Sequence, residues 1–82
     1  MIIINQQKDT IMNFQKIKTI YIKDSSDNIM KSYNIMAYLG GADDDDIECL
    51  GIYKTKERAE SVLESIITRY QDENMVYRMP ED

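Results

Sequence analysis

The densest group of side chains that could do chemistry is an unbroken run of four aspartates, Asp43, Asp44, Asp45 and Asp46. Carboxylate oxygens are the ligands that Ca²⁺ prefers, but calcium loops space their ligands at alternate positions, with a glycine turn and a distal glutamate. This chain lacks that spacing, so we expect no metal site and no cofactor. Two interpretations stay open: the run faces a basic partner, or it is a solvated hairpin tip that discourages edge pairing.

The partner-facing interpretation has a specific geometric form. Alternate residues of a strand lie about 6.5–7 Å apart, which is close to the spacing of successive phosphates along one nucleic-acid strand. A hairpin edge that carries the aspartate run, with Glu48, Asp24 and Asp27 nearby, would fit a basic groove that normally holds nucleic acid. This hypothesis makes the acidic hairpin a phosphate mimic.

The charge is distributed unevenly along the 82 residues, whose net charge is −5. Residues 1–23 carry four lysines and one aspartate, residues 24–53 carry seven acids and one lysine, and residues 54–82 carry five basic and seven acidic groups. The three segments therefore have net charges of +3, −6 and −2. So negative a middle segment disfavours nucleic acid and anionic lipid as direct partners and favours a basic protein surface.

The residue types that most enzymes use are scarce. The chain has no histidine, which removes the commonest general base and metal ligand, and it has one cysteine, Cys49. A lone cysteine in an apolar strand is usually a small packed hydrophobe. One cysteine forms no intramolecular disulfide, and no apolar run approaches the length of a membrane span. The start from Met1 to Asn5 is too short and uncharged for a signal peptide, so we expect none. We expect a non-catalytic protein of the cytoplasm.

Tyrosines offer a second candidate surface. Tyr21 and Tyr38 alternate with apolar residues, so they would lie on the sheet face opposite Ile20 and Ile35. If a helix covers the isoleucine face, the tyrosines and Met36 form an exposed apolar patch, which would be a partner site or the seam of a homodimer. The alternative is that the tyrosines belong to the core.

The elements that must position these side chains form one domain, residues 1–82, of the α+β class. We expect a curved antiparallel sheet of about four to six strands with one amphipathic helix packed across it near the C-terminus. The expected strands are residues 2–4, 10–14, 17–23, 32–39, 47–53 and an edge strand at 75–77. Asp24 to Asn28 and Gly40-Gly41 supply turn chemistry, and Gly51 indicates a bulge or a close backbone approach.

The helix is expected from Thr55, as N-cap, to Tyr70. Its apolar residues recur at helical spacing and form one continuous stripe, which is expected to be buried on the sheet. The stripe comprises Ala59, Val62, Leu63, Ile66, Ile67 and Tyr70.

The segment from Leu50 to Ala59 has the pattern L-G-x-Y-K-T-x-E-R-A, and Val62, Leu63 and Ile66 follow it. With the opening Ile2 to Asn5 and the closing Met79-Pro80-Glu81, it resembles a group of small uncharacterised proteins of Gram-positive bacteria and their phages and mobile elements. The resemblance implies a scaffold of strand, N-cap and helix, and it brings no known activity. A phage setting would suit an inhibitor of a host nucleic-acid enzyme, such as an anti-CRISPR protein, by analogy alone.

Two functions from different classes follow from these observations. The first is a small acidic protein-binding module that inhibits or regulates a host nucleic-acid enzyme through the phosphate-mimicking hairpin. The second is a structural or homo-oligomeric accessory domain whose acidity serves only solubility.

Overall fold

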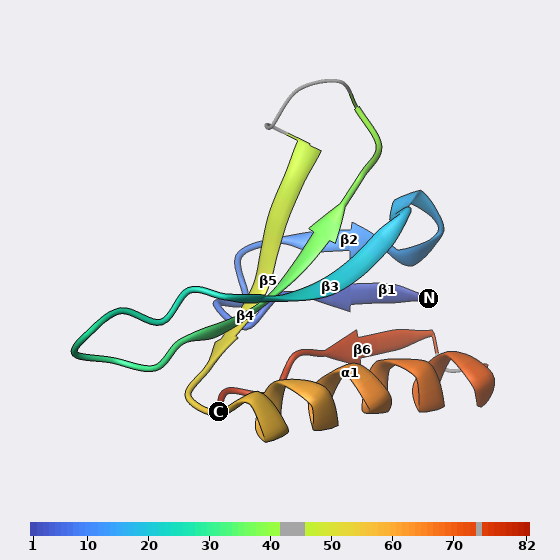
Figure 1. The fold of residues 1–82 in the computed structure, drawn as a ribbon. Helices are drawn as coiled ribbons and strands as arrows, with labels where there is room; N and C mark the ends of the chain where they lie inside the picture. The colour runs from blue at the N-terminus through green and yellow to red at the C-terminus, as the bar shows by residue number, and fades with distance from the viewer. Residues whose placement is uncertain (42–45, 74) are drawn as a thin grey trace.

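The computed structural model describes residues 1–41, 46–73 and 75–82. Over these residues the chain forms two three-stranded sheets and one α-helix that packs against the strands (Figure 1). In chain order the elements are β1 (Ile2–Ile4), β2 (Ile11–Asn13), the 3₁₀-helix η1 (Phe14–Lys16), β3 (Thr19–Asp24), β4 (Tyr33–Tyr38), β5 (Ile47–Tyr53), α1 (Lys56–Gln71) and β6 (Val76–Arg78). The predicted α+β class, with its single C-terminal helix, is confirmed.

The first sheet has the strand order β2-β1-β6. The β1–β2 pair joins the first two predicted strands, and in it Ile3 lies opposite Met12. The predicted edge strand after the helix forms as β6, where Tyr77 lies opposite Ile3 on the other side. This pair is parallel, which the expected antiparallel sheet did not include. It is parallel because α1 carries the chain back to the start of β1 before β6 begins.

The second sheet is antiparallel throughout, with the order β3-β4-β5. Its register shifts between Ile35, which lies opposite Gly51, and Met36, which lies opposite Cys49. Leu50 is therefore an extra residue on β5, and the predicted bulge is confirmed. The close approach is also present, because a Cβ atom added to Gly51 would lie 2.8 Å from the hydroxyl oxygen of Tyr53.

The helix begins as predicted, with the Thr55 side chain accepting a hydrogen bond from the Arg58 amide at 3.1 Å. Three residues of the apolar stripe are buried, namely Ala59, Val62 and Ile66. The prediction that the whole stripe is buried was wrong for two residues at its edge: Ile67 is 47% exposed and Tyr70 is 53% exposed. The helix packs mainly over β4 and β5, so the side of the stripe that faces β3 is only partly covered.

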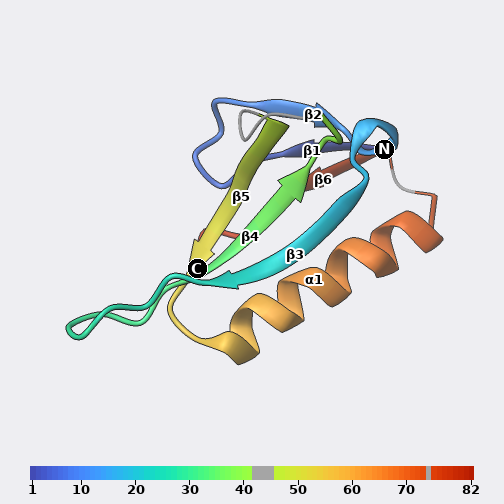
Figure 2. The same ribbon diagram turned by 45° about the horizontal axis from the view of Figure 1, so that its top comes forward.

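The core lies where the two sheets and the helix meet. Figure 2 shows α1 along one side of the strands, with the connection between β3 and β4 projecting from the body. Each layer contributes buried side chains, and the fully buried ones of greatest volume are Tyr53, Ile3, Ile35, Leu50 and Val62. Burial of these five apolar groups stabilises the domain by about 1.5–3 kcal/mol each before the cost in conformational entropy.

Candidate functional site

The acidic residues of the middle segment lie at two separate places. Asp24 ends β3 and Asp27 follows it, beside the start of β4, whereas Asp46 and Glu48 lie beside the end of β4 (Figure 1). The six residues of β4 span roughly 17–20 Å between the two places. The hypothesis that Asp24 and Asp27 lie near the aspartate run was therefore wrong, because strands that pair antiparallel put successive hairpin turns at opposite ends of the sheet.

Asp43, Asp44 and Asp45 lie outside the described residues. Asp46 is half-buried, and its carbonyl oxygen accepts a hydrogen bond from the Leu39 amide at 2.8 Å, which continues the β4–β5 ladder. Its carboxylate lies against Gly41, where a Cβ atom would overlap it. Glu48 is exposed, opposite Ala37. These two acids mark the described part of the acidic hairpin.

Asp24 and Asp27 have partners within their own loop. The Asp24 carboxylate accepts a hydrogen bond from the Ser26 amide at 2.9 Å. The Asp27 carboxylate accepts hydrogen bonds from the amides of Ile29 and Met30 at 2.8 and 2.7 Å. These backbone donors hold the pKa of each carboxyl below its usual value. The predicted turn chemistry is confirmed, and both aspartates are engaged in shaping this loop.

The tyrosines lie on the sheet face away from the core. Tyr21 is opposite Met36, and Tyr38 is opposite Ile47, while the alternate residues of β4, such as Ile35, are buried on the other face. Tyr21, Met36 and Tyr38 are all half-buried. The Tyr38 hydroxyl donates a hydrogen bond to the Gly41 carbonyl oxygen at 2.9 Å, so it ties β4 to the start of the acidic hairpin. We call Tyr21, Met36 and Tyr38 the tyrosine face.

Cys49 is half-buried on β5 and contacts the Gly51 carbonyl oxygen, with the sulfur 3.6 Å away. Burial raises the pKa of its thiol, which the hydrogen bond to Gly51 lowers in part, and the nearby Glu48 charge adds a smaller increase. A thiol whose pKa is raised is a weaker nucleophile at neutral pH, because less of it is thiolate. The surroundings of Cys49 favour packing over chemistry.

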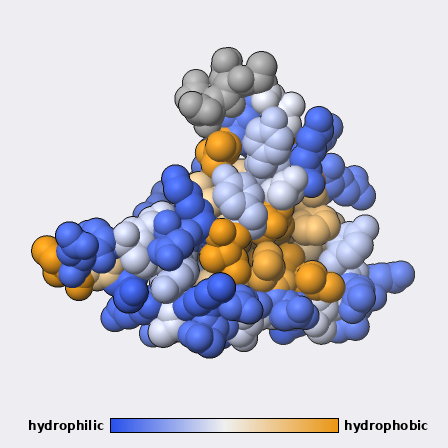
Figure 3. Space-filling model, in the orientation of Figure 1, coloured by the Kyte–Doolittle hydropathy of each residue, from blue (hydrophilic) through white to orange (hydrophobic). Residues whose placement is uncertain are grey.

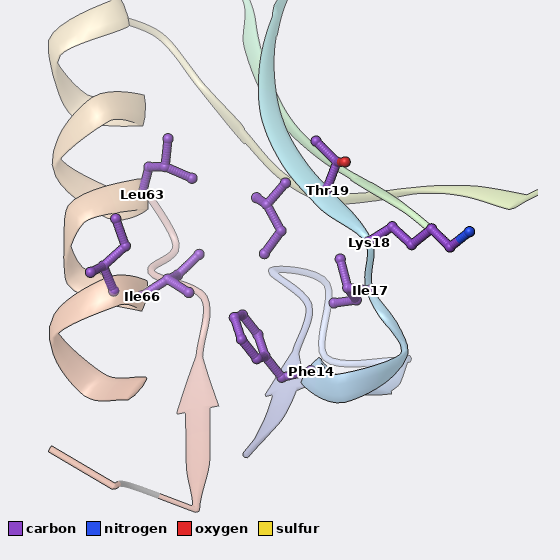
Figure 4. Close-up of a pocket in the computed structure, with 8 residues that line it drawn as sticks. Phe14, Ile17, Lys18, Thr19, Leu63 and Ile66 are labelled. Atoms are coloured by element: carbon purple, nitrogen blue, oxygen red, sulfur yellow. The ribbon is translucent and has the colours of Figure 1, made fainter. Parts of the chain in front are cut away.

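A groove between η1, β3 and α1 was not predicted from the sequence. It has a volume of about 240 Å³ and is lined mainly by apolar side chains. Figure 3 shows apolar side chains gathered on this face above the helix, and Figure 4 shows Phe14, Ile17, Leu63 and Ile66 converging in it. The apolar stripe of the helix is wider than the surface that the strands bury. This excess width is the sequence signal that could have predicted the groove.

Phe14, which lines this groove, also packs against the ring of Tyr70. Their centroids lie 4.9 Å apart with the planes tilted by 34°. Such a tilted aromatic pair is favourable, and it links η1 to the last turn of the helix. The remaining lining residues are Lys18, Thr19, Ile20 and Ile67.

Within the described parts of the chain, no three of the potential metal-ligating side chains (His, Cys, Asp, Glu) come together. No helix in those parts is long and apolar enough to cross a membrane. Comparisons of the chain with protein-family models, with curated proteins and with solved structures find no match. The resemblance to small proteins of phages and mobile elements stays a prediction.

Proposed function

We propose that this chain is a non-catalytic binding module of the bacterial cytoplasm that inhibits or regulates a nucleic-acid enzyme. The acidic β4–β5 hairpin is its working surface, and the hairpin enters a basic groove that the enzyme uses for phosphates. The observation that carries the proposal is the position of this hairpin. The start of β5 projects beyond the first sheet and the helix (Figure 1), and the sequence between the end of β4 at Tyr38 and the start of β5 at Ile47 contains the run from Asp43 to Asp46.

The placement of Asp24 and Asp27 sharpens this proposal. Because they lie at the other end of β4 and accept hydrogen bonds from their own loop, the phosphate-mimicking charges are those of the aspartate run and Glu48. The Tyr38 hydroxyl, which holds the Gly41 carbonyl, fixes the base of the hairpin. The tyrosine face beside it offers apolar area next to the charge, which is the composition of many protein interfaces.

The test is capture of proteins from a bacterial lysate by the immobilised chain, compared with two variants of equal charge. In the first, Asp43, Asp44, Asp45 and Asp46 are replaced by Asn, which keeps shape and removes four charges. The matched control replaces four exposed acids on or near the helix, Glu60→Gln, Glu64→Gln, Asp72→Asn and Glu73→Gln. Bound protein is then challenged with double-stranded DNA and with RNA.

We expect the wild type and the helix control to capture the same nucleic-acid enzyme, and the hairpin variant to capture far less of it. Added nucleic acid should release the enzyme, because both ligands occupy one groove. Affinity should fall with salt for the wild type and less steeply for the hairpin variant, since fewer charges take part. Equal binding by both variants, or binding that nucleic acid does not displace, would refute the phosphate-mimicking hairpin and leave the tyrosine face as the better candidate.

A further inference from the structure

The three residues of β6 line a pocket together with one residue of the helix. The pocket has a volume of about 280 Å³, and its lining residues are Arg69, Val76, Tyr77 and Arg78. Val76 and Arg78 are exposed on one face of the strand and Tyr77 is buried on the other, so a pocket that touches all three lies at an edge of β6. One edge pairs with β1, which is not part of this lining, and the pocket therefore lies at the outer edge.

The backbone groups of β6 divide between its two edges. The Met79 amide donates to the Ile4 carbonyl of β1 at 3.0 Å, so residue 79 and its alternates, residues 75 and 77, face β1. The N–H and C=O groups of Val76 and Arg78 are therefore directed to the outer edge. Within the described parts of the chain, these four groups have no backbone partner.

The two edges of the second sheet offer less to an added strand. On β5 the Ile52 amide donates to the Gln6 side-chain oxygen at 2.8 Å, and the Ile52 carbonyl accepts from the Gln6 side-chain nitrogen at 3.1 Å, so this edge is occupied. The outer edge of β3 has no such partner among the described residues. The groove beside it is lined by apolar side chains and by Lys18, whose side chain lies against Gly40 (Figure 4). That edge therefore selects no partner by charge.

Two guanidinium groups flank the outer edge of β6. Arg78 lies on the strand itself, and Arg69 lies on the side of the helix that faces the strand. This position of Arg69 follows because the Tyr77 hydroxyl contacts the Ser65 hydroxyl, one helical turn earlier. Neither arginine forms an ion pair within the described residues. Each planar guanidinium is thus available to bind a carboxylate through two hydrogen bonds.

We propose that the outer edge of β6 binds an extended acidic segment of a partner protein, which adds to the first sheet as a fourth strand beside α1 (Figure 1). Its backbone supplies donors and acceptors to the four edge groups of Val76 and Arg78. Because its side chains alternate, a carboxylate opposite Arg78 lies on the outer face, and the next one, opposite Tyr77, points toward Arg69. An apolar residue opposite Val76 covers a side chain that is 43% exposed.

The groups at this edge favour an acidic polypeptide over other occupants. A phosphate offers acceptors alone, so the edge carbonyls of Val76 and Arg78 would lack donors. A second copy that paired β6 with β6 would bring the arginines of both chains together, and like charges repel. An acidic polypeptide supplies both the opposite charge and the missing donors. This contact lies on the first sheet and uses neither the acidic hairpin nor the partner that the hairpin binds.

The test uses the peptide acetyl-Thr-Val-Glu-Glu-Val-Thr-amide, whose sequence is the same from either end, so no strand direction is assumed. NMR titration of the full chain measures the dissociation constant, which we expect at about 0.1–1 mM for so short a strand. One matched peptide has glutamine in place of both glutamates. Another carries N-methyl groups on both glutamate amides, which keeps the charge and removes backbone donors. Each should bind about tenfold more weakly or worse.

Three variants locate the charge contacts. Arg69→Gln and Arg78→Gln should each weaken binding by about threefold to tenfold. Lys54→Gln is the matched control, because it removes one positive charge from an exposed side chain outside the pocket, and it should change the affinity by less than about twofold. All three side chains are exposed, so the variants should fold, which circular dichroism checks.

Amide hydrogen exchange locates the added strand. The Val76 and Arg78 amides should exchange quickly in the free chain and become protected when the peptide is added. The Met79 amide, which donates to β1, should be protected in both states. Protection of the first two amides by the N-methylated peptide is not expected.

Absence of binding at about 10 mM peptide overturns the proposal. So does a glutamine peptide that binds as well as the glutamate peptide, or binding that leaves the Val76 and Arg78 amides unprotected, because these results remove the charge recognition or the added strand. Shifts of these two amides that depend on protein concentration without peptide would assign the edge to a second copy. Tighter binding of a short single-stranded DNA to the same residues would assign it to phosphates, and either result overturns the proposal as well.

Discussion

The side-chain amide of Gln6 pairs with the main chain of Ile52 in both directions. Its oxygen accepts from the Ile52 nitrogen at 2.8 Å, and its nitrogen donates to the Ile52 carbonyl at 3.1 Å. The same nitrogen also contacts the carbonyl oxygens of Pro80 and Glu81 at 3.2 and 2.6 Å. One glutamine therefore joins the first hairpin, the bulged strand β5 and the C-terminal segment.

The first prediction concerns this junction. Gln6→Ala should lower the free energy of unfolding by about 1–3 kcal/mol, because several hydrogen bonds with a net value near 1 kcal/mol each are lost and the β5 groups are left to water. Gln7→Ala is the control, since Gln7 is exposed, and should change stability by less than about 0.5 kcal/mol. Urea unfolding of both variants measures these changes. Equal losses in the free energy of unfolding would show that the hydrogen bonds of Gln6 do not stabilise the fold.

A second prediction separates two adjacent isoleucines of α1. Ile66 is 2% exposed and Ile67 is 47% exposed. Ile66→Ala should lower the free energy of unfolding by about 2–5 kcal/mol because it opens a cavity in the core. Ile67→Ala should cost less than about 1 kcal/mol in dilute monomeric protein. If the two losses were similar, the helix would sit on the strands with a different face than the one described.

The third prediction is an alkaline pH dependence. Burial, with a smaller contribution from the neighbouring Tyr77, raises the pKa of Tyr53 to about 12 from its ordinary value of 10.0. The folded state therefore resists ionisation. The stability that depends on neutral Tyr53 is fully present below pH 10.0, and it is lost as the pH rises through the window up to about 12.

Tyr53→Phe tests this dependence. The variant should be less stable at pH 8 by about 1 kcal/mol, since the hydroxyl donates to the Pro80 carbonyl, and it should lack the Tyr53 contribution at higher pH. The stability difference between wild type and variant should thus shrink from pH 8 to pH 11. Parallel pH profiles would show that Tyr53 titrates normally.

The fourth prediction concerns the β3–β4 loop in acid. Amide donors from Ile29 and Met30 lower the pKa of Asp27, so its stabilising effect is present above the unfolded pKa and disappears as the pH falls through the lower folded value. In an NMR titration the Asp27 carboxyl should titrate below 3.8, and the Ile29 and Met30 amide signals should move with the same midpoint. Amide signals that do not follow the carboxyl would mean that these hydrogen bonds do not form in solution.

Local patterns predicted most of the secondary structure correctly. The helix has its N-cap at Thr55, the bulge lies at Leu50 beside Gly51, and the first two strands pair, because each depends on residues close in the chain. The sequence also placed Tyr21 and Tyr38 on the face opposite Ile20 and Ile35, since strand alternation is a period of two and does not depend on tertiary contacts. It left open which of the two faces meets the core.

The features that could not be predicted depend on contacts between distant segments. Strands β1 and β6 are separated by most of the chain, so nothing local indicates that they pair in parallel or that the strands divide over two sheets. Gln6 lies in a polar stretch with no signal of its reach to Ile52. Asp24 was predicted to lie near Asp46 because both belong to the same acidic segment of the sequence. The charge of a segment does not show which way its strands run, and β4 places the two residues at opposite ends of the sheet.

The contrast between the two edges of the second sheet limits how far self-association can go. A chain with two free edges would add copies without end and form a fibril. Here the Gln6 backbone amide occupies the Leu50 carbonyl and the Gln6 side chain occupies both backbone groups of Ile52, so a further strand cannot add to β5 at these residues. Gln6→Ala would free the Ile52 groups, so polymerisation and thioflavin-positive aggregates should arise in that variant before they arise in the wild type.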